Sequence, residues 1–342
     1  MIKYLLSLFA FLFTCSSITT AQQKLNVVSS CSIFEDMARN IAGDLVDLTS
    51  IVPIGGDPHV HSPTPRDARI VQTADLILVN GLTFEGWIQE LIDNSGTKGE
   101  TILITKGIKP IASQIYADSA DPHAWMNAEN GLIYIKNITD AFIKADPANK
   151  DQYTGNYNQY KAKIISAHEE IKAEIAKISE SKRVLITSHD AFSYFGKEYG
   201  LQVEPIIGVS TEADVQTADM IRVAKTIQEK QVPALFVEST INPKILQQIA
   251  KDNDVKIGGE LYADSLGKLG SEGDTYIGML LHNAKTISKG LNMKTTKNTL
   301  PPEVTEQLEQ VNTKGLNFLI YFGIGLAVVL IALFLRKRSQ DV

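Results

Sequence analysis

The sequence is poor in cysteine, in histidine and in basic charge. Its 342 residues include 2 cysteines and 6 histidines, and 33 lysines and arginines face 39 aspartates and glutamates, for a net charge of −6. Nucleic-acid binding calls for a basic face, so the charge balance argues against a nucleic-acid partner. The length suits two domains with real hydrophobic cores.

The N-terminal end has the layout of a signal peptide over residues 1–21. Lys3 gives a positive start, residues 5–13 form a short apolar run, and residues 16–21 are small and polar. Cleavage near Ala21 leaves Cys31 as the sole cysteine, which excludes an internal disulfide and favours a small buried side chain. A lipid on Cys15 is the second possibility for this end.

The C-terminal end predicts a transmembrane helix. Residues 316–335 carry no charge, and a helix of about 20 residues matches the ~30 Å hydrocarbon core of a bilayer. Arg336, Lys337 and Arg338 follow directly, so the positive-inside rule predicts a cytoplasmic tail over 336–342 and a main body outside the cytoplasmic membrane.

Strand-like and helix-like runs alternate between the two ends. Strands are predicted over residues 25–29, 46–52, 76–79, 101–104, 184–187, 202–207, 234–237 and 255–258, and helices over 33–42, 129–145, 217–230, 243–252 and 274–290. A further helix opens at Thr64, where Pro65 suits the first helical position and Asp67 completes a capping box. This alternation predicts an α/β fold with mainly parallel sheets.

One long amphipathic helix separates the two halves. From residue 150 to about 179, apolar residues recur at spacings of three, four or seven without a proline, over roughly 45 Å. It indicates a rigid connection between two lobes. The predicted layout is a signal peptide (1–21), a first lobe (22–148), a connecting helix (149–180), a second lobe (181–294), a linker (295–315), the membrane span (316–335) and the tail (336–342).

The chemistry-bearing residues follow predicted strand ends. Asp-Pro-His occurs twice, ending at His59 and at His123, and proline makes each copy a stiff turn that presents an imidazole. His189 and Asp264 follow strands of the second half. Open α/β sheets bind ligands outside the carboxyl ends of their strands, so the four residues can meet between the lobes. Three imidazoles and one carboxylate suit zinc and other first-row divalent ions.

The remaining candidates are assigned lesser roles. His61, two residues after His59, is expected to point away from the ion and to lie exposed or just behind a ligand. Glu238, at a strand end, can accept a hydrogen bond from a ligand histidine, although a solvated carboxylate fits the sequence equally well. His168 and His282 are predicted at the surface of their helices.

Four ordered blocks resemble the metal-binding receptors of zinc and manganese ABC uptake systems. They are residues 57–67 with 74–82, 121–127, 188–195 and 272–276, and the resemblance covers about residues 25–291. It implies two α/β lobes joined by a rigid helix, His59, His123, His189 and Asp264 as ligands of a cargo ion, and delivery to a permease with its cytoplasmic ATPase. Zinc receptors often carry a histidine-rich loop, absent from residues 107–119, and many manganese receptors have a carboxylate at His189, so both metals stay open.

The function predicted is therefore that of a monomeric extracytoplasmic receptor without catalytic activity. Two other classes stay open. His59-Val60-His61 is also compatible with a metal-dependent hydrolase of amidohydrolase type, which would need a barrel of eight βα units and an open metal position. An adhesion protein with a structural metal is the third class.

Overall fold

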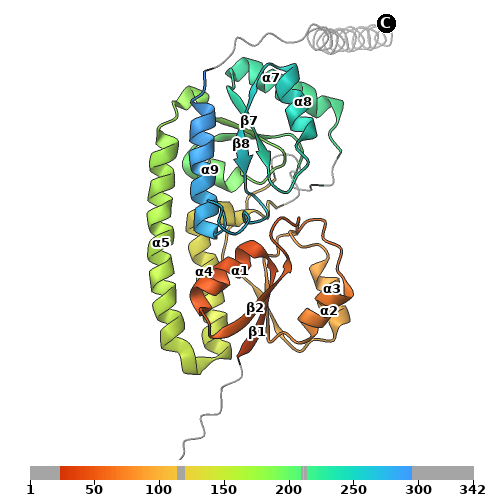
Figure 1. The fold of residues 1–342 in the computed structure, drawn as a ribbon, viewed down its shortest axis with the longest axis vertical. Helices are drawn as coiled ribbons and strands as arrows, with labels where there is room; N and C mark the ends of the chain where they lie inside the picture. The colour runs from red at the N-terminus through yellow and green to blue at the C-terminus, as the bar shows by residue number, and fades with distance from the viewer. Residues whose placement is uncertain (1–23, 114–119, 209–210, 212–213, 295–342) are drawn as a thin grey trace, which may run out of the picture.

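The protein forms two α/β lobes stacked along one long helix (Figure 1). The structure is a computed structural model that describes residues 24–113, 120–208, 211 and 214–294. The predicted signal peptide, linker, membrane span and tail all lie outside the described residues.

The first lobe is built on a four-stranded parallel sheet. Its strand order is β2-β1-β3-β4, from β1 (Leu25–Cys31), β2 (Val46–Val52), β3 (Leu76–Val79) and β4 (Glu100–Leu103). Helices α1 (Ser32–Ala42), α2 (Pro65–Gln72), α3 (Ile88–Ser95) and α4 (Ala128–Ala145) surround it. The predicted capping box at Thr64 and Asp67 is confirmed, whereas α3 was not predicted.

The second lobe contains two pairs of parallel strands. β5 (Val184–Thr187) pairs with β6 (Gln202–Pro205), β7 (Ala234–Glu238) pairs with β8 (Lys256–Leu261), and β5 lies next to β7. The helices of this lobe are α6 (Ser193–Tyr199), α7 (Thr217–Lys230), α8 (Lys244–Asp252) and α9 (Tyr276–Leu291). In the described part of the chain the strands therefore form separate open sheets, and the amidohydrolase barrel does not form.

Helix α5 (Lys150–Ala176) runs beside both lobes (Figure 1). Its 27 residues give it a length of roughly 40 Å. It packs on α1 and α4 of the first lobe and on α6 and α9 of the second. One continuous apolar core extends from the first sheet under α4 and α5 to α9, and a smaller one lies beneath α7 and α8.

The predicted fold class needs one correction, which concerns the C-terminal transmembrane helix. Within the described ranges, no helix has both the length and the apolar character needed to cross a bilayer. The predicted span, residues 316–335, is outside those ranges. For the described residues, the fold class is two α/β lobes with parallel sheets and a connecting helix.

Candidate metal centre

The two Asp-Pro-His turns have the same local construction. In each turn an aspartate Oδ1 accepts the backbone N–H of the histidine two residues later, at 2.9 Å from Asp57 to His59 and 2.8 Å from Asp121 to His123. In each turn a side-chain N–H from elsewhere holds the proline carbonyl: Trp87 Nε1 donates to Pro58 at 2.7 Å, and Asn80 Nδ2 donates to Pro122 at 3.0 Å. Both imidazoles are therefore presented by fixed backbone.

The other two residues come from the second lobe. His189 follows β5, and Asp264 follows β8. The loop of Asp264 is held by the first lobe on both sides: Trp125 Nε1 donates to the Ala263 carbonyl at 3.0 Å, and the Gly55 N–H donates to Ser265 Oγ at 2.7 Å. The position of this carboxylate thus depends on the contact between the lobes.

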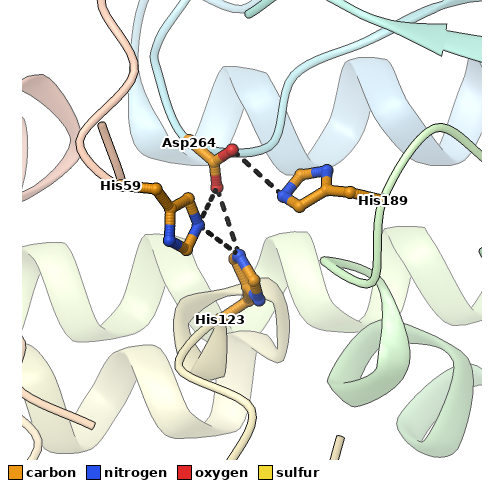
Figure 2. A group of neighbouring side chains, drawn as sticks. All are labelled: His59, His123, His189 and Asp264. Atoms are coloured by element: carbon orange, nitrogen blue, oxygen red, sulfur yellow. Dashed lines mark hydrogen bonds and ion pairs between the residues drawn. The ribbon is translucent and has the colours of Figure 1, made fainter. Parts of the chain in front are cut away.

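All four side chains point toward one another (Figure 2). His59 Nε2 lies 3.1 Å from His123 Nε2 and 3.9 Å from Asp264 Oδ1, which is 3.3 Å from His123 Nε2. His189 Nε2 lies 3.2 Å from Asp264 Oδ2. Ligands of a tetrahedral ion with bonds of ~2.0–2.1 Å lie ~3.3 Å apart, so this spacing fits one first-row divalent cation.

Buried carboxylates stand behind two of the imidazoles. Asp121 Oδ1 is hydrogen-bonded to His123 Nδ1 at 2.7 Å. Glu238 Oε2 lies 2.7 Å from His189 Nδ1, and its Oε1 accepts the His189 backbone N–H at 2.9 Å. Partners of this kind fix the tautomer of a metal-binding histidine and aim Nε2 at the ion. The sequence pointed to Glu238 but not to this role of Asp121, although Asp121 is part of the repeated motif.

Burial and neighbouring carboxylates shift the pKa values of the group in opposite directions. Burial disfavours the imidazolium, yet Asp121 and Asp264 raise the pKa of His123 to about 9. Against the same burial, Glu238 and Asp264 hold the pKa of His189 well above its usual value. Burial lowers the pKa of His59 to about 3. Asp264 is ionised, because His189 and His123 outweigh its burial and keep its pKa well below the usual range.

Several buried polar atoms of the group make no hydrogen bond in the part of the chain that the structure describes, as expected of side chains that can hold a cation. Both Asp264 oxygens and His189 Nε2 are buried and lack a hydrogen-bond partner among the described residues. A buried carboxylate needs a compensating positive charge, and a coordinated cation supplies that charge once the histidines have lost their protons. Beside the group lies a cavity of about 250 Å³, whose walls include Asp57, Val60, Ser188 and Ile207.

The other histidines lie elsewhere. His61 Nε2 is 3.2 Å from Asp67 Oδ2 and its ring packs on Trp87, so His61 lies beside the first turn and does not belong to the group of four. His282 is partly exposed. The prediction of a surface position for His168 was wrong: its residue is 6% exposed, because α6 and α4 cover this face of α5.

The chain is similar in sequence to known metal-uptake proteins. A family model described as "Zinc-uptake complex component A periplasmic" matches residues 27–290. The manganese ABC transporter substrate-binding lipoprotein PsaA of Streptococcus pneumoniae is 36% identical over 292 residues, which cover 82% of this chain and 94% of PsaA. The metal ABC transporter substrate-binding lipoprotein FimA of Streptococcus parasanguinis is 36% identical, with the same coverage of both chains. Both relatives are named lipoproteins.

Solved structures agree with the sequence relatives. The periplasmic zinc-binding protein TroA from Treponema pallidum superposes with a TM-score of 0.75 at 30% identity, covering 79% of this chain and 100% of TroA. A manganese-bound periplasmic metal-binding protein from Candidatus Liberibacter asiaticus superposes with a TM-score of 0.72 at 32% identity and the same coverage. The chain thus belongs to the periplasmic zinc-uptake component A family, whose members are the metal-binding receptors of ABC transporters.

Proposed function

We propose that this protein captures one divalent transition metal ion outside the cytoplasm, with His59, His123, His189 and Asp264 as its ligands, and delivers it to a membrane permease. The observation that carries the proposal is the convergence of three Nε2 atoms on an Asp264 carboxylate whose oxygens make no hydrogen bond in the described part of the chain. The side chains of His123, His189 and Asp264 are 0% exposed, and that of His59 is 8% exposed.

A receptor role fits this site better than catalysis. A catalytic zinc keeps three protein ligands and one open position for water or substrate. Here the four proposed ligands would fill all four positions around a tetrahedral ion, and the group is almost fully buried. A closed set of ligands suits an ion that is carried rather than one that activates water.

The donor set favours zinc over manganese on intrinsic affinity. Three imidazoles and one carboxylate follow the Irving–Williams order, in which zinc binds more tightly than manganese. The relatives are named for manganese, for zinc or for metal in general. We therefore propose tighter zinc binding in vitro, with either ion as the cargo in the cell.

Delivery requires the cleft to open by a small movement. The lobes are joined by α5, which is stiffer than a loop, and by interlobe hydrogen bonds such as Tyr276 Oη to the Trp125 carbonyl at 2.7 Å and Tyr194 Oη to the Asp121 carbonyl at 3.1 Å. We propose that the receptor docks on a permease whose transport cycle is driven by a cytoplasmic ATPase. Contact with the permease then loosens the loop that carries Asp264. Loss of that carboxylate would lower the affinity enough to release the ion.

Attachment to the membrane is proposed through a lipid on Cys15. The support is that both curated relatives are named lipoproteins and that Cys15 follows the apolar run of the signal sequence. A Cys15→Ala variant should leave the membrane fraction and should not incorporate labelled palmitate. If it still sediments with membranes, this mode of attachment is rejected.

Metal titration of single variants tests the ligand set. The full chain should bind one zinc ion tightly, and Asp264→Ala or His189→Ala should each weaken this binding strongly, because a buried protein ligand is lost and a water must take the fourth position. His61→Ala is the matched control, since His61 lies beside the site without belonging to it. Zinc affinity in either ligand variant equal to that of the unsubstituted protein would reject the proposed ligands.

A further inference from the structure

We propose a second divalent-cation site at His168, Glu198 and Glu129, where helices α4, α5 and α6 meet. One ligand atom from each residue lies within 4.8 Å of the others. It shares no residue with the cargo site. Its donors come from the first lobe (α4), the connecting helix (α5) and the second lobe (α6).

The observation that points to a ligand is the state of the His168 ring. The side chain is 7% exposed, and its Nδ1 is hydrogen-bonded to Tyr199 Oη at 3.1 Å. Nε2 is buried and has no hydrogen-bond partner among the described residues. When Nδ1 carries the proton and donates to Tyr199, the Nε2 lone pair is free, as in a metal-binding histidine.

Carboxylates surround this nitrogen. His168 Nε2 lies 3.8 Å from Glu198 Oε1 and 4.0 Å from Glu129 Oε1. Ligands of one tetrahedral ion lie ~3.3 Å apart, so a shift of roughly half an ångström in each glutamate side chain would bring both oxygens to an ion on Nε2. The Glu129 side chain is 62% exposed and free to make that shift. Glu198 is held in place because its Oε2 accepts from Asn127 Nδ2 at 3.1 Å, which leaves Oε1 to face the histidine.

Nearby charges leave these two glutamates available. Glu169 Oε1 is also 3.9 Å from His168 Nε2, but Lys172 Nζ lies 3.5 Å from the same oxygen and pairs with it. A cavity of about 260 Å³ opens beside the ring, lined by Glu129, His168, Glu169, Lys172 and apolar side chains of α4 and α5. One neutral imidazole with two carboxylates suits zinc, cobalt or nickel better than magnesium or calcium, which prefer all-oxygen sites.

The position of the site gives it a mechanical consequence. Glu129 lies in the first turn of α4, shortly after the loop of His123, and Glu198 lies in α6, shortly after the loop of His189. An ion held by Glu129 of α4, Glu198 of α6 and His168 of α5 would tie the two loops that carry cargo ligands. Its binding should therefore oppose separation of the lobes.

The test uses zinc as the probe and the full chain in an Asp264→Ala background, which weakens the cargo site. In this background, zinc should still raise the midpoint of thermal unfolding, and calorimetry should count one bound ion. Adding His168→Gln or Glu198→Gln should weaken this binding by about tenfold or more, because each removes a ligand. Glu198→Gln keeps an oxygen for Asn127, so it changes charge with little change in packing.

His282→Gln is the matched control, since His282 also faces a glutamate, with its Nδ1 3.2 Å from Glu272 Oε2, but is engaged at Nε2 by the Glu260 carbonyl at 3.0 Å. It should leave zinc binding unchanged. A dissociation constant weaker than about 1 mM in the Asp264→Ala chain would overturn the proposal. Equal zinc binding with and without Glu198→Gln, in chains with the same circular dichroism spectrum, would overturn it as well.

Discussion

Glu238→Gln is expected to weaken metal binding at the cargo site about 10- to 100-fold, the usual effect of removing a carboxylate behind a metal-binding histidine. The Glu238 side chain is 0% exposed, with Oε2 2.7 Å from His189 Nδ1. The substitution keeps the size of the side chain and an oxygen for the His189 backbone N–H. It removes the negative charge and places an amide NH2 where Oε2 faced His189 Nδ1.

Metal affinity should fall, and not rise, because of the charge on the other side of the His189 imidazole. The carboxylate faces at most one added proton on His189 when the site is empty, and a divalent ion when it is loaded. Loss of its charge therefore destabilises the loaded form more than the empty form. A 10- to 100-fold change corresponds to about 1.4–2.8 kcal/mol of binding free energy.

The assay is zinc competition against a chelator of known affinity at fixed pH. Glu260→Gln is the control, because Glu260 lies on the same strand pair with an exposed side chain. The unfolding midpoint of the metal-free variant should show that the fold is intact. An affinity within twofold of the unsubstituted protein would refute the reasoning, since Glu238 would then only fill space.

Three further outcomes are expected. Zinc affinity should rise from pH 6 through about pH 9, and zinc binding should release protons. The reason is that Asp121 and Asp264 raise the pKa of His123 to about 9 against its burial, and this proton must leave before the metal binds. Calorimetry in two buffers of different ionisation heat that finds no proton release would contradict this. Zinc should displace manganese at equal concentration, as measured by metal analysis after dialysis, and the reverse order would reject an N₃O site. Burial raises the pKa of Glu85 from 4.5 to about 7, so the contribution of Glu85 to stability is complete below pH 4.5 and is lost as pH rises through 7. Relative to the Glu85→Gln variant, the metal-free protein should lose roughly 3 kcal/mol of unfolding free energy between these pH values. Urea unfolding that gives parallel pH profiles for the two proteins would refute this pKa shift.

Local sequence chemistry predicted most of the regular elements. The strands β2, β3 and β5 follow from short runs rich in apolar and β-branched residues, and the capped start of α2 follows from hydrogen bonds between near neighbours. Such patterns can be read from a single chain. The short helices α3 and α6 were missed, because their 8 and 7 residues show too few turns for a period and are stabilised mainly by packing.

The candidate site divides in the same way. The sequence alone placed three histidines and Asp264 after strand ends, because parallel strands gather these ends at one edge. It could not choose which histidine Glu238 would support, nor show that Trp125 holds the Ala263 carbonyl across 138 residues of sequence. It also placed His168 at the surface, where the tertiary structure buries it against Tyr199. Those contacts join segments that are distant in the chain, so the packing of the two lobes decides them and no local pattern encodes them.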